Sequence, residues 1–345
     1  MNRGYLIYPI VLLALLALLA ASLVFGSVDI PLRGVWGILI GDTEGYIRDS
    51  WRHIVLESRL PQALTALLAG GALAVSGLML QTLFRNPLAG PSILGISDGA
   101  NLGVAIVMLY MGGVVHLVEW LPLSGYLAII LAAMVGASLV LGIIIFFSTR
   151  VKSNTMLLII GIMVGYMVSS LISILNFRAS SDKVHAFVMW GMGDFSGVSM
   201  EKMPYFAAFI IIALVGALLL IKPLNALLLG DSYAANLGVN VPRARLLILL
   251  CTGLLTATTT AFCGPISFIG LAVPQIARLI LGSSNHKHLL PSTILLGAFV
   301  ALFCNLMSVV VGDNQIFPLN AITPIFGAPV IIYVIMNRKN IQYFN

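Results

Sequence analysis

The chain has 345 residues, of which 60% are hydrophobic and 9% are charged, and its formal net charge is +6. Soluble domains are about half apolar and about a quarter charged, so this composition excludes a cytosolic enzyme, a secreted disulfide scaffold and a disordered chain. Because a membrane-spanning helix needs about 20 apolar residues, the hydrophobic content is sufficient for about ten spans. The apolar residues run continuously instead of alternating, which argues against an outer-membrane β-barrel.

Uncharged stretches locate the predicted spans, because a charged residue at the centre of a membrane helix costs about 2.5–3.5 kcal/mol. The stretch 246–277 is too long for one span and is broken at Gly264-Pro265, so its second half, continued to Leu281, predicts a short additional span. We therefore predict an all-α polytopic membrane protein with about ten transmembrane helices in a single domain, residues 1–345. The stretches without Asp, Glu, Lys or Arg are 4–28, 60–84, 99–118, 120–149, 153–177, 203–221, 246–277, 288–312 and 314–337.

The distribution of Lys and Arg in short loops predicts the orientation. The first stretch is apolar for roughly 21 residues, longer than the core of a signal peptide, so we expect an uncleaved helix that begins in the cytoplasm. Both termini are then cytoplasmic, and the basic charge reflects topology, not a nucleic-acid partner. The inner residues are Arg3, Arg85, Arg150, Lys152, Lys222, Arg243, Arg245, Lys287, Arg338 and Lys339, and the outer ones are Arg33, Arg48, Arg52, Arg178, Lys183 and Lys202.

Three predicted loops are long enough to receive a partner. Loops 27–56 and 178–202 are on the outer side, and loop 222–245 is the longest cytoplasmic connection. A further loop, after the second span, carries Pro87 and Pro91. Because proline disfavours helix for the residue before it, we expect a helix stop there. We expect Ser97 or Asp98 to cap the next helix.

Several strings in the sequence together resemble the permease subunits of ATP-driven importers for iron-siderophores, haem and cobalamin. The resemblance covers about residues 55–335, in order and with matching spacing. The strings are Arg59-Leu-Pro, Leu67-Leu-Ala-Gly-Gly-Ala-Leu-Ala, Ser76-Gly, Arg85-Asn-Pro-Leu-Ala-Gly-Pro, Leu94-Gly-Ile-Ser-Asp-Gly-Ala, the Leu-Gly-Asp string from Leu229 to Gly238, Gly264-Pro-Ile-Ser-Phe-Ile-Gly-Leu, Leu290-Pro to Ala298, Pro318, and Thr323-Pro-Ile-Phe-Gly-Ala-Pro.

This resemblance implies a permease in the cytoplasmic (inner) membrane that pairs with a second copy of itself around one path. It further implies two ATPase subunits on the cytoplasmic face and a substrate-binding protein outside. The chain has no G-x-x-x-x-G-K-[ST] string to hold phosphates. We therefore expect a transport subunit that is not an enzyme and has no cofactor of its own, with ATP-Mg bound in the partner. The resemblance also implies that the cargo is a bulky metal chelate and that alternating access moves it inward.

The cytoplasmic loop 222–245 carries the predicted coupling element. Gly230 and Gly238 bracket about two helical turns, with Asp231 or Ser232 as the N-cap and Gly238 at the C′ position. A small apolar surface of Ala234, Ala235 and Leu237 would fit a groove in a partner. The resemblance implies that the ATPase docks here.

The fifth predicted span carries the candidate path residues. Gly161, Gly165, Ser169 and Ser173 recur every four residues and Asn176 follows, so small and polar groups share one face. This face predicts the wall of a translocation path, and close helix packing is the alternative. Ser153, Asn154 and Thr155 precede the span; they fit a helix cap, and the resemblance implies an inner gate.

Docking of the binding protein is predicted at Arg59 on the outer side, where the resemblance implies a charge-assisted contact with an acidic residue. The sequence departs from the family pattern at Gln62 and Val309, where a basic residue is common, at Asn305, where Asp is expected, and at Gln275, where His is common.

The remaining candidates point to no metal site. Cys251, Cys263 and Cys304 are expected to be small core residues. His286 and His288 are expected in a solvated loop. The alternative function is an ion-coupled secondary transporter, which usually needs ionisable residues at membrane depth. Asp98 is the only acid that falls in a predicted span, near its inner end.

Overall fold

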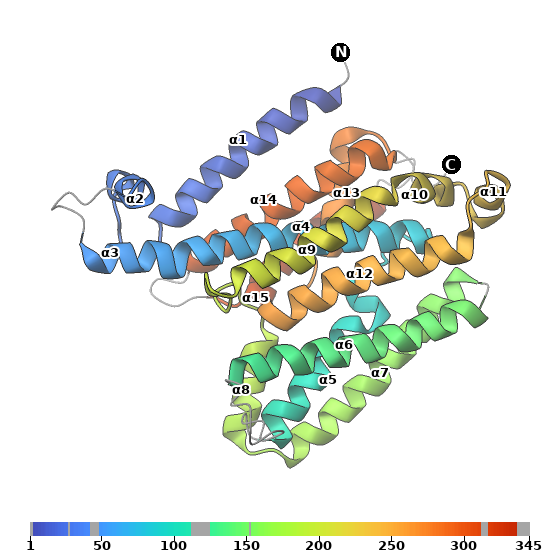
Figure 1. The fold of residues 1–345 in the computed structure, drawn as a ribbon, viewed down its shortest axis with the longest axis horizontal. Helices are drawn as coiled ribbons and strands as arrows, with labels where there is room; N and C mark the ends of the chain where they lie inside the picture. The colour runs from blue at the N-terminus through green and yellow to red at the C-terminus, as the bar shows by residue number, and fades with distance from the viewer. Residues whose placement is uncertain are drawn as a thin grey trace.

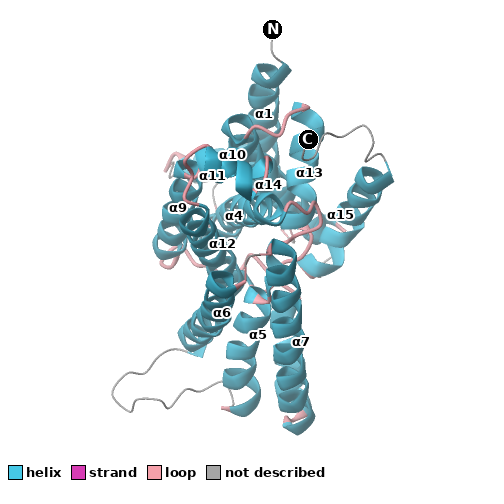
Figure 2. Ribbon diagram, turned by 90° about the vertical axis from the view of Figure 1, so that its right-hand side faces the viewer, coloured by secondary structure: helices cyan, strands magenta, loops and turns pink. Residues whose placement is uncertain are grey.

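A computed structural model describes residues 3–26, 28–41, 48–111, 125–151, 153–311 and 317–336. These residues form helices joined by short turns, and no strand occurs among them (Figures 1 and 2). In chain order the helices are α1 (Arg3–Val24), α2 (Leu32–Leu39), α3 (Asp49–His53), η1 (Ile54–Arg59), α4 (Leu60–Phe84), η2 (Pro91–Leu94), α5 (Ile96–Ala105), η3 (Ile106–Tyr110), α6 (Gly125–Arg150), α7 (Asn154–Arg178), α8 (Ser181–Gly191), α9 (Met203–Leu219), α10 (Ile221–Leu228), α11 (Asp231–Asn236), α12 (Val241–Cys263), α13 (Ile269–Leu281), α14 (His286–Val310) and α15 (Leu319–Met336).

The described helices confirm a polytopic all-α protein. Five of them are long and apolar enough to cross a membrane, namely the continuous helix Asp49–Phe84 together with α6, α7, α12 and α14. The consecutive helices α9 and α10 form a further apolar pair that is bent by 55°. Four shorter apolar helices are Tyr8–Val24, Ile96–Tyr110, Ile269–Leu281 and Leu319–Tyr333. The exact number of spans and the side of each terminus stay predictions.

The boundaries differ from the predicted ones where charges fall inside a helix. The second span was predicted to begin at residue 60, but the helix begins at Asp49 and passes through the π-helical turn η1. The predicted loop 222–245 is mostly helical, with α10, α11 and the start of α12. The predicted break at Gly264-Pro265 is confirmed, since α12 ends at Cys263 and α13 runs from Ile269 to Leu281.

Helix α4 is the central element of the bundle (Figure 1). It contacts α14, α12, α13, α9 and α10, and every residue from Ala69 to Phe84 is buried. A helix that is apolar on all sides is expected to lie inside a larger assembly of helices. Two glycines bring its neighbours very close: a Cβ atom at Gly70 would overlap the carbonyl oxygen of Gly297 in α14. At Gly77 it would overlap the carbonyl oxygen of Gly270 in α13.

A second group of helices flanks this core. Helices α5, α6 and α7 contact one another on one side of the molecule (Figures 1 and 2). Helix α7 is less enclosed than α4, and large side chains such as Tyr166, Met167, Ile174 and Phe177 are exposed along it. The chain therefore has a tightly enclosed central helix and a flank whose apolar faces are open to lipid or to another protein.

The contact at Gly77 predicts that the substitution Gly77→Ala destabilises the protein. The added methyl group would collide with the backbone of Gly270, and overpacking of this kind typically costs about 1–3 kcal/mol. We expect a lower apparent melting temperature in detergent. Gly142→Ala in α6 is the matched control, since a Cβ atom at Gly142 meets nothing within 4 Å. Equal melting temperatures for the two variants would contradict the close α4–α13 contact.

Candidate functional site

The short helix α11 lies at one end of the bundle, beside α10 and α12 (Figure 1, right); we call this the α11 end. Gly230 and Gly238 flank the helix with φ angles of +105° and +82°, a region that L-residues with side chains rarely adopt. Gly238 follows the C-cap Leu237, so its predicted C′ position is confirmed. The predicted N-cap was wrong, because neither Asp231 nor Ser232 caps the helix and Gly230 is at that position.

The exposed face of α11 differs from the predicted surface. Ala234 is fully buried and faces the rest of the chain, so it cannot belong to an exposed docking surface. Tyr233 and Leu237 have 51% and 59% of their surface exposed, and Ala235 is also exposed. Sequence reasoning missed Tyr233, although its spacing of four residues from Leu237 would place both on one helical face.

A polar cluster lies directly behind α11. Arg245 in α12 donates from Nη2 to Oδ2 of Asp231 at 3.3 Å, and from Nη1 to the carbonyl oxygens of Ser148 and Val151 at 3.4 and 3.2 Å. Asn154 donates from Nδ2 to the carbonyl oxygen of Leu83 at 2.8 Å and to the same oxygen of Asp231 at 3.5 Å. Asp231 thereby joins α11 to α12 and to the first residue of α7.

The predicted inner-gate residues lie beside this cluster. Ser153 is the N-cap of α7 and accepts a hydrogen bond from the backbone amide of Met156 at 3.4 Å, which confirms its expected capping role. Asn154 is buried, whereas Thr155 is exposed. The structure thus brings the predicted coupling helix and the predicted gate together, although Asp231 and Asn154 are 77 residues apart in the sequence.

The predicted path residues of α7 divide into two sets. Gly161 is buried against η2, where a Cβ atom would lie 3.1 Å from Cα of Leu94. Gly165 is buried against the first turn of α5, where a Cβ atom would lie 2.7 Å from Oδ2 of Asp98. Ser169 and Ser173 are exposed, and Asn176 is partly buried. The glycines therefore serve close packing within the chain, while the serine end of the stripe is open. The N-cap of α5 is Gly95, so the predicted cap by Asp98 was wrong.

Arg59 lies in the η1 turn and is 7% exposed. Its Nη1 atom donates to the carbonyl oxygens of Leu23 and Val24 at 2.8 and 2.7 Å, and its Nη2 atom donates to the carbonyl oxygen of Val28. The guanidinium therefore satisfies carbonyl groups at the C-terminal end of α1. A docking contact by Arg59 would require the side chain to leave these acceptors.

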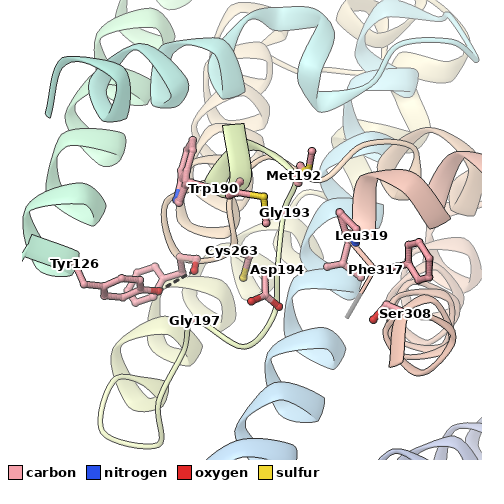
Figure 3. Close-up of a pocket in the computed structure, with 13 residues that line it drawn as sticks. Tyr126, Trp190, Met192, Gly193, Asp194, Gly197, Cys263, Ser308, Phe317 and Leu319 are labelled. Carbon is pink, nitrogen blue, oxygen red and sulfur yellow. Dashed lines mark hydrogen bonds between the residues drawn. The ribbon is translucent and has the colours of Figure 1, made fainter. Parts of the chain in front are cut away.

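A cavity of about 400 Å³ lies at the opposite end of the bundle. Figure 3 shows Tyr126 and Trp190 on one side of it and Ser308 and Phe317 on the other. Asp194 is held at its wall, because its amide donates to the carbonyl oxygen of Cys263 at 2.8 Å and its carboxylate accepts from Ser196. Sequence reasoning did not single out this cavity, since its residues come from five separate segments.

The break after α12 forms part of the same end. Asn320 at the start of α15 donates to the carbonyl oxygens of Gly191 and Pro265 at 3.2 and 2.6 Å, and accepts from the amide of Ser267 at 2.9 Å. One amide side chain therefore fastens α8 and α15 to the Gly264-Pro265 string. Its partners are 53 or more residues away in the sequence, so no local signal identified it.

The histidine prediction was wrong for His286. Its side chain is fully buried, with Nε2 2.9 Å from Oγ1 of Thr82 and Nδ1 2.9 Å from Oδ1 of Asn225. The three cysteines are unpaired, and Cys263 and Cys304 are buried as expected, while Cys251 is partly buried. Within the described residues, no group of three or more His, Cys, Asp or Glu side chains is placed to hold a metal ion.

Comparison with known proteins identifies the family. Residues 13–337 match the model of the FecCD transport family. The chain belongs to this family. It is 35% identical over 287 residues to the vitamin B12 import system permease protein BtuC of Salmonella paratyphi A, covering 82% of this chain and 83% of BtuC. It is 32% identical over 334 residues to the hemin transport system permease protein HmuU of Yersinia pestis, covering 96% and 95% of the two chains.

A solved structure gives the same assignment. A transporter described as of the metal-chelate ABC type, in an inward-facing conformation, superimposes with a TM-score of 0.81 at 27% identity, over 95% of this chain and 97% of that one. The sequence resemblance to importer permeases is therefore confirmed. This FecCD permease is a multi-pass membrane protein whose relatives are transport subunits.

For this FecCD permease, the burial of Arg59 predicts a structural effect of Arg59→Gln. The variant would leave carbonyl oxygens of Leu23, Val24 and Val28 without their donor, and each buried acceptor left unsatisfied costs about 1–3 kcal/mol. We expect a clearly lower apparent melting temperature in detergent. Arg52→Gln, an exposed position on the same helix, is the control. If Arg59→Gln were as stable as this control but bound the substrate-binding protein more weakly, Arg59 would instead be a docking residue.

Proposed function

We propose that this chain is the membrane-spanning subunit of an ATP-driven importer, which moves a bulky metal chelate into the cytoplasm by alternating access. The observation that carries the proposal is the match of residues 13–337 to the FecCD family, supported by relatives named for vitamin B12 and hemin transport. The cargo is accordingly a cobalamin, a haem or a ferric siderophore. The covalent chemistry, ATP hydrolysis with Mg²⁺, takes place in a partner subunit.

The proposed assembly contains a second copy of the chain in the cytoplasmic membrane. The exposed apolar side chains along α7 support this arrangement, because a large uncovered apolar face is available for a partner. With two copies around one path, the exposed Ser169 and Ser173 and the partly buried Asn176 would face the cargo. Weakly polar walls suit a large ligand that must be released.

The proposed motor contact lies at the α11 end, which this assignment places in the cytoplasm with both termini. Tyr233, Ala235 and Leu237 form a small exposed apolar face on a short helix, and such faces fit grooves in partner proteins. The ATPase would push on α11, and the adjacent segment Ser153–Asn154–Thr155 would act as the inner gate. The substrate-binding protein would dock at the opposite end, next to the cavity that contains Asp194.

Uptake into liposomes tests the proposed function. The permease is reconstituted with its cognate ATPase and binding protein, and cyanocobalamin, haemin and ferrichrome are supplied in turn. We expect ATP-dependent uptake of one of them, and none with an ATPase whose catalytic residues are inactivated. Uptake that ignores nucleotide, follows a proton or sodium gradient and is abolished by Asp98→Asn would instead identify an ion-coupled transporter.

The exposed face of α11 predicts the effect of the double substitution of Tyr233→Ala and Leu237→Ala. Burial of one such side chain contributes about 1.5–3 kcal/mol, so we expect at least a tenfold loss of ATPase affinity, since about 1.4 kcal/mol corresponds to tenfold. Co-purification and titration with the ATPase measure it. Tyr205→Ala, at a tyrosine on α9 that is also exposed (69% against 51% for Tyr233), is the control. Replacement of residues 231–237 by a flexible linker should detach the ATPase altogether, and its retention would contradict the assignment.

A further inference from the structure

The short helix α11 has two different attachments to the rest of the chain. It packs on α10 and touches α12, and Ala234 is the buried residue of the helix. Its other attachment is polar and is made at its first residue, where one carboxylate oxygen of Asp231 faces both Arg245 and Asn154. A push on α11 would therefore reach the remainder of the chain through this carboxylate.

Arg245 extends the attachment to the end of α6. Its guanidinium is buried, and Nη1 donates to the carbonyl oxygens of Ser148 and Val151, the last turn of α6 and the residue just beyond it. The last carbonyls of a helix lack partners within the helix and carry partial negative charge, so a cation is stabilised there. The guanidinium of arginine presents five donors in a fixed planar fork, whereas lysine carries one compact ammonium group on a flexible stem. Arg245 thus connects α11 to the end of α6, which immediately precedes the proposed gate segment.

Asn154 completes the connection on the gate itself. It is the first residue of α7, and it donates both to Asp231 and to the carbonyl oxygen of Leu83 near the end of α4. A movement of Asp231 would therefore change the position of Asn154 relative to α4.

The neighbouring helix α10 has polar attachments of its own. Asn225 of α10 accepts from His286 and donates to Asn285 at 3.0 Å, and His286 in turn contacts Thr82 of α4. Helix α10 is therefore tied to α14 and α4, whereas α11 is tied to α12 and to the gate. Gly230, with φ of +105°, separates the two helices and allows a change of direction between them.

We propose that Arg245 is a positioning residue that, through Asp231 and the carbonyl groups of Ser148 and Val151, transmits movement of α11 to the segment Ser153–Asn154–Thr155. This proposal rests on the proposed function and specifies the residues that connect its motor contact to its inner gate.

The test measures the accessibility of a cysteine beside the proposed gate segment in the complex of the permease with its ATPase. The three native cysteines are replaced by alanine, and Met156→Cys, at an exposed position one residue beyond the gate segment, reports accessibility by its rate of maleimide labelling. Labelling is compared without nucleotide and with ATP plus vanadate. The variants are Asp231→Asn, Arg245→Gln and the exchanged pair Asp231→Arg with Arg245→Asp; Asp231→Glu is the conservative variant. Arg243→Gln, an exposed arginine on the same helix, is the matched control.

We expect the nucleotide-dependent change in labelling rate to fall at least fivefold in Asp231→Asn and Arg245→Gln while the ATPase still co-purifies and hydrolyses ATP. Asp231→Glu and Arg243→Gln should retain most of the change. The exchanged pair should not restore it, because an aspartate at position 245 cannot donate to the carbonyl groups of Ser148 and Val151. If Arg245→Gln fails to fold, Asp231→Asn and Asp231→Glu decide the question.

Two results would overturn the proposal. One is an unchanged labelling response in Asp231→Asn, and the other is loss of the ATPase from that variant, which would make Asp231 a docking residue. If the unaltered complex itself bound no ATPase or showed no response to nucleotide, the proposed function would fail, and the proposal with it.

Discussion

The close approach of α4 to α13 and α14 is the constraint on which the rest of the structure depends. Glycines at positions 70 and 77 place the backbone of α4 directly against Gly297 and Gly270, where no side chain would fit. Lipid offers apolar helices no hydrophobic drive to associate, so such backbone contact supplies the packing energy. Because α4 is buried from Ala69 to Phe84, neighbouring helices are attached at both of its ends. Arg59 at one end binds carbonyl groups of α1, and the carbonyl group of Leu83 at the other end accepts from Asn154 at the start of α7.

Two buried arginines, one at each end of the bundle, donate to the carbonyl groups that end a helix. Arg59 donates to the final carbonyls of α1, and Arg245 donates to the carbonyls at the end of α6. A buried cation is costly unless its charge and its donors are satisfied, and helix C-termini provide acceptors with the right partial charge. Both side chains therefore connect two helices that are distant in the sequence. Arg245 also forms an ion pair with the carboxylate of Asp231 on the short helix α11. At this end of the bundle, the buried arginine therefore also connects to a helix that a partner could move.

Local sequence patterns predicted much of the fold, and long-range polar contacts account for what they missed. Uncharged stretches located the long apolar helices, because desolvation of charge is a local cost, and the Gly264-Pro265 string marked the break after α12. The same rule placed the start of the second helix too late, because Arg59 inside it is satisfied by carbonyl groups of α1 and because Arg52 and Glu57 are exposed. His286 was assigned to a solvated loop because its partners, Thr82 and Asn225, lie 204 and 61 residues away. Gln62 and Asn305 looked like two separate departures from the family pattern, yet they form one hydrogen bond of 3.1 Å, a neutral pair where the pattern has a basic and an acidic residue.

The stripe of small residues on α7 shows why a single periodic pattern can serve two purposes. Its glycine half lies against the chain that leads into α5, so these positions are small because two backbones meet there. Its serine half is open to the surroundings of this chain. Since a path between two copies must be lined by surfaces that one copy leaves uncovered, the serine half can contribute to its wall and the glycine half cannot. The glycines instead keep α7 packed on α5, so the serines and two of the proposed gate residues, Asn154 and Thr155, lie on one helix.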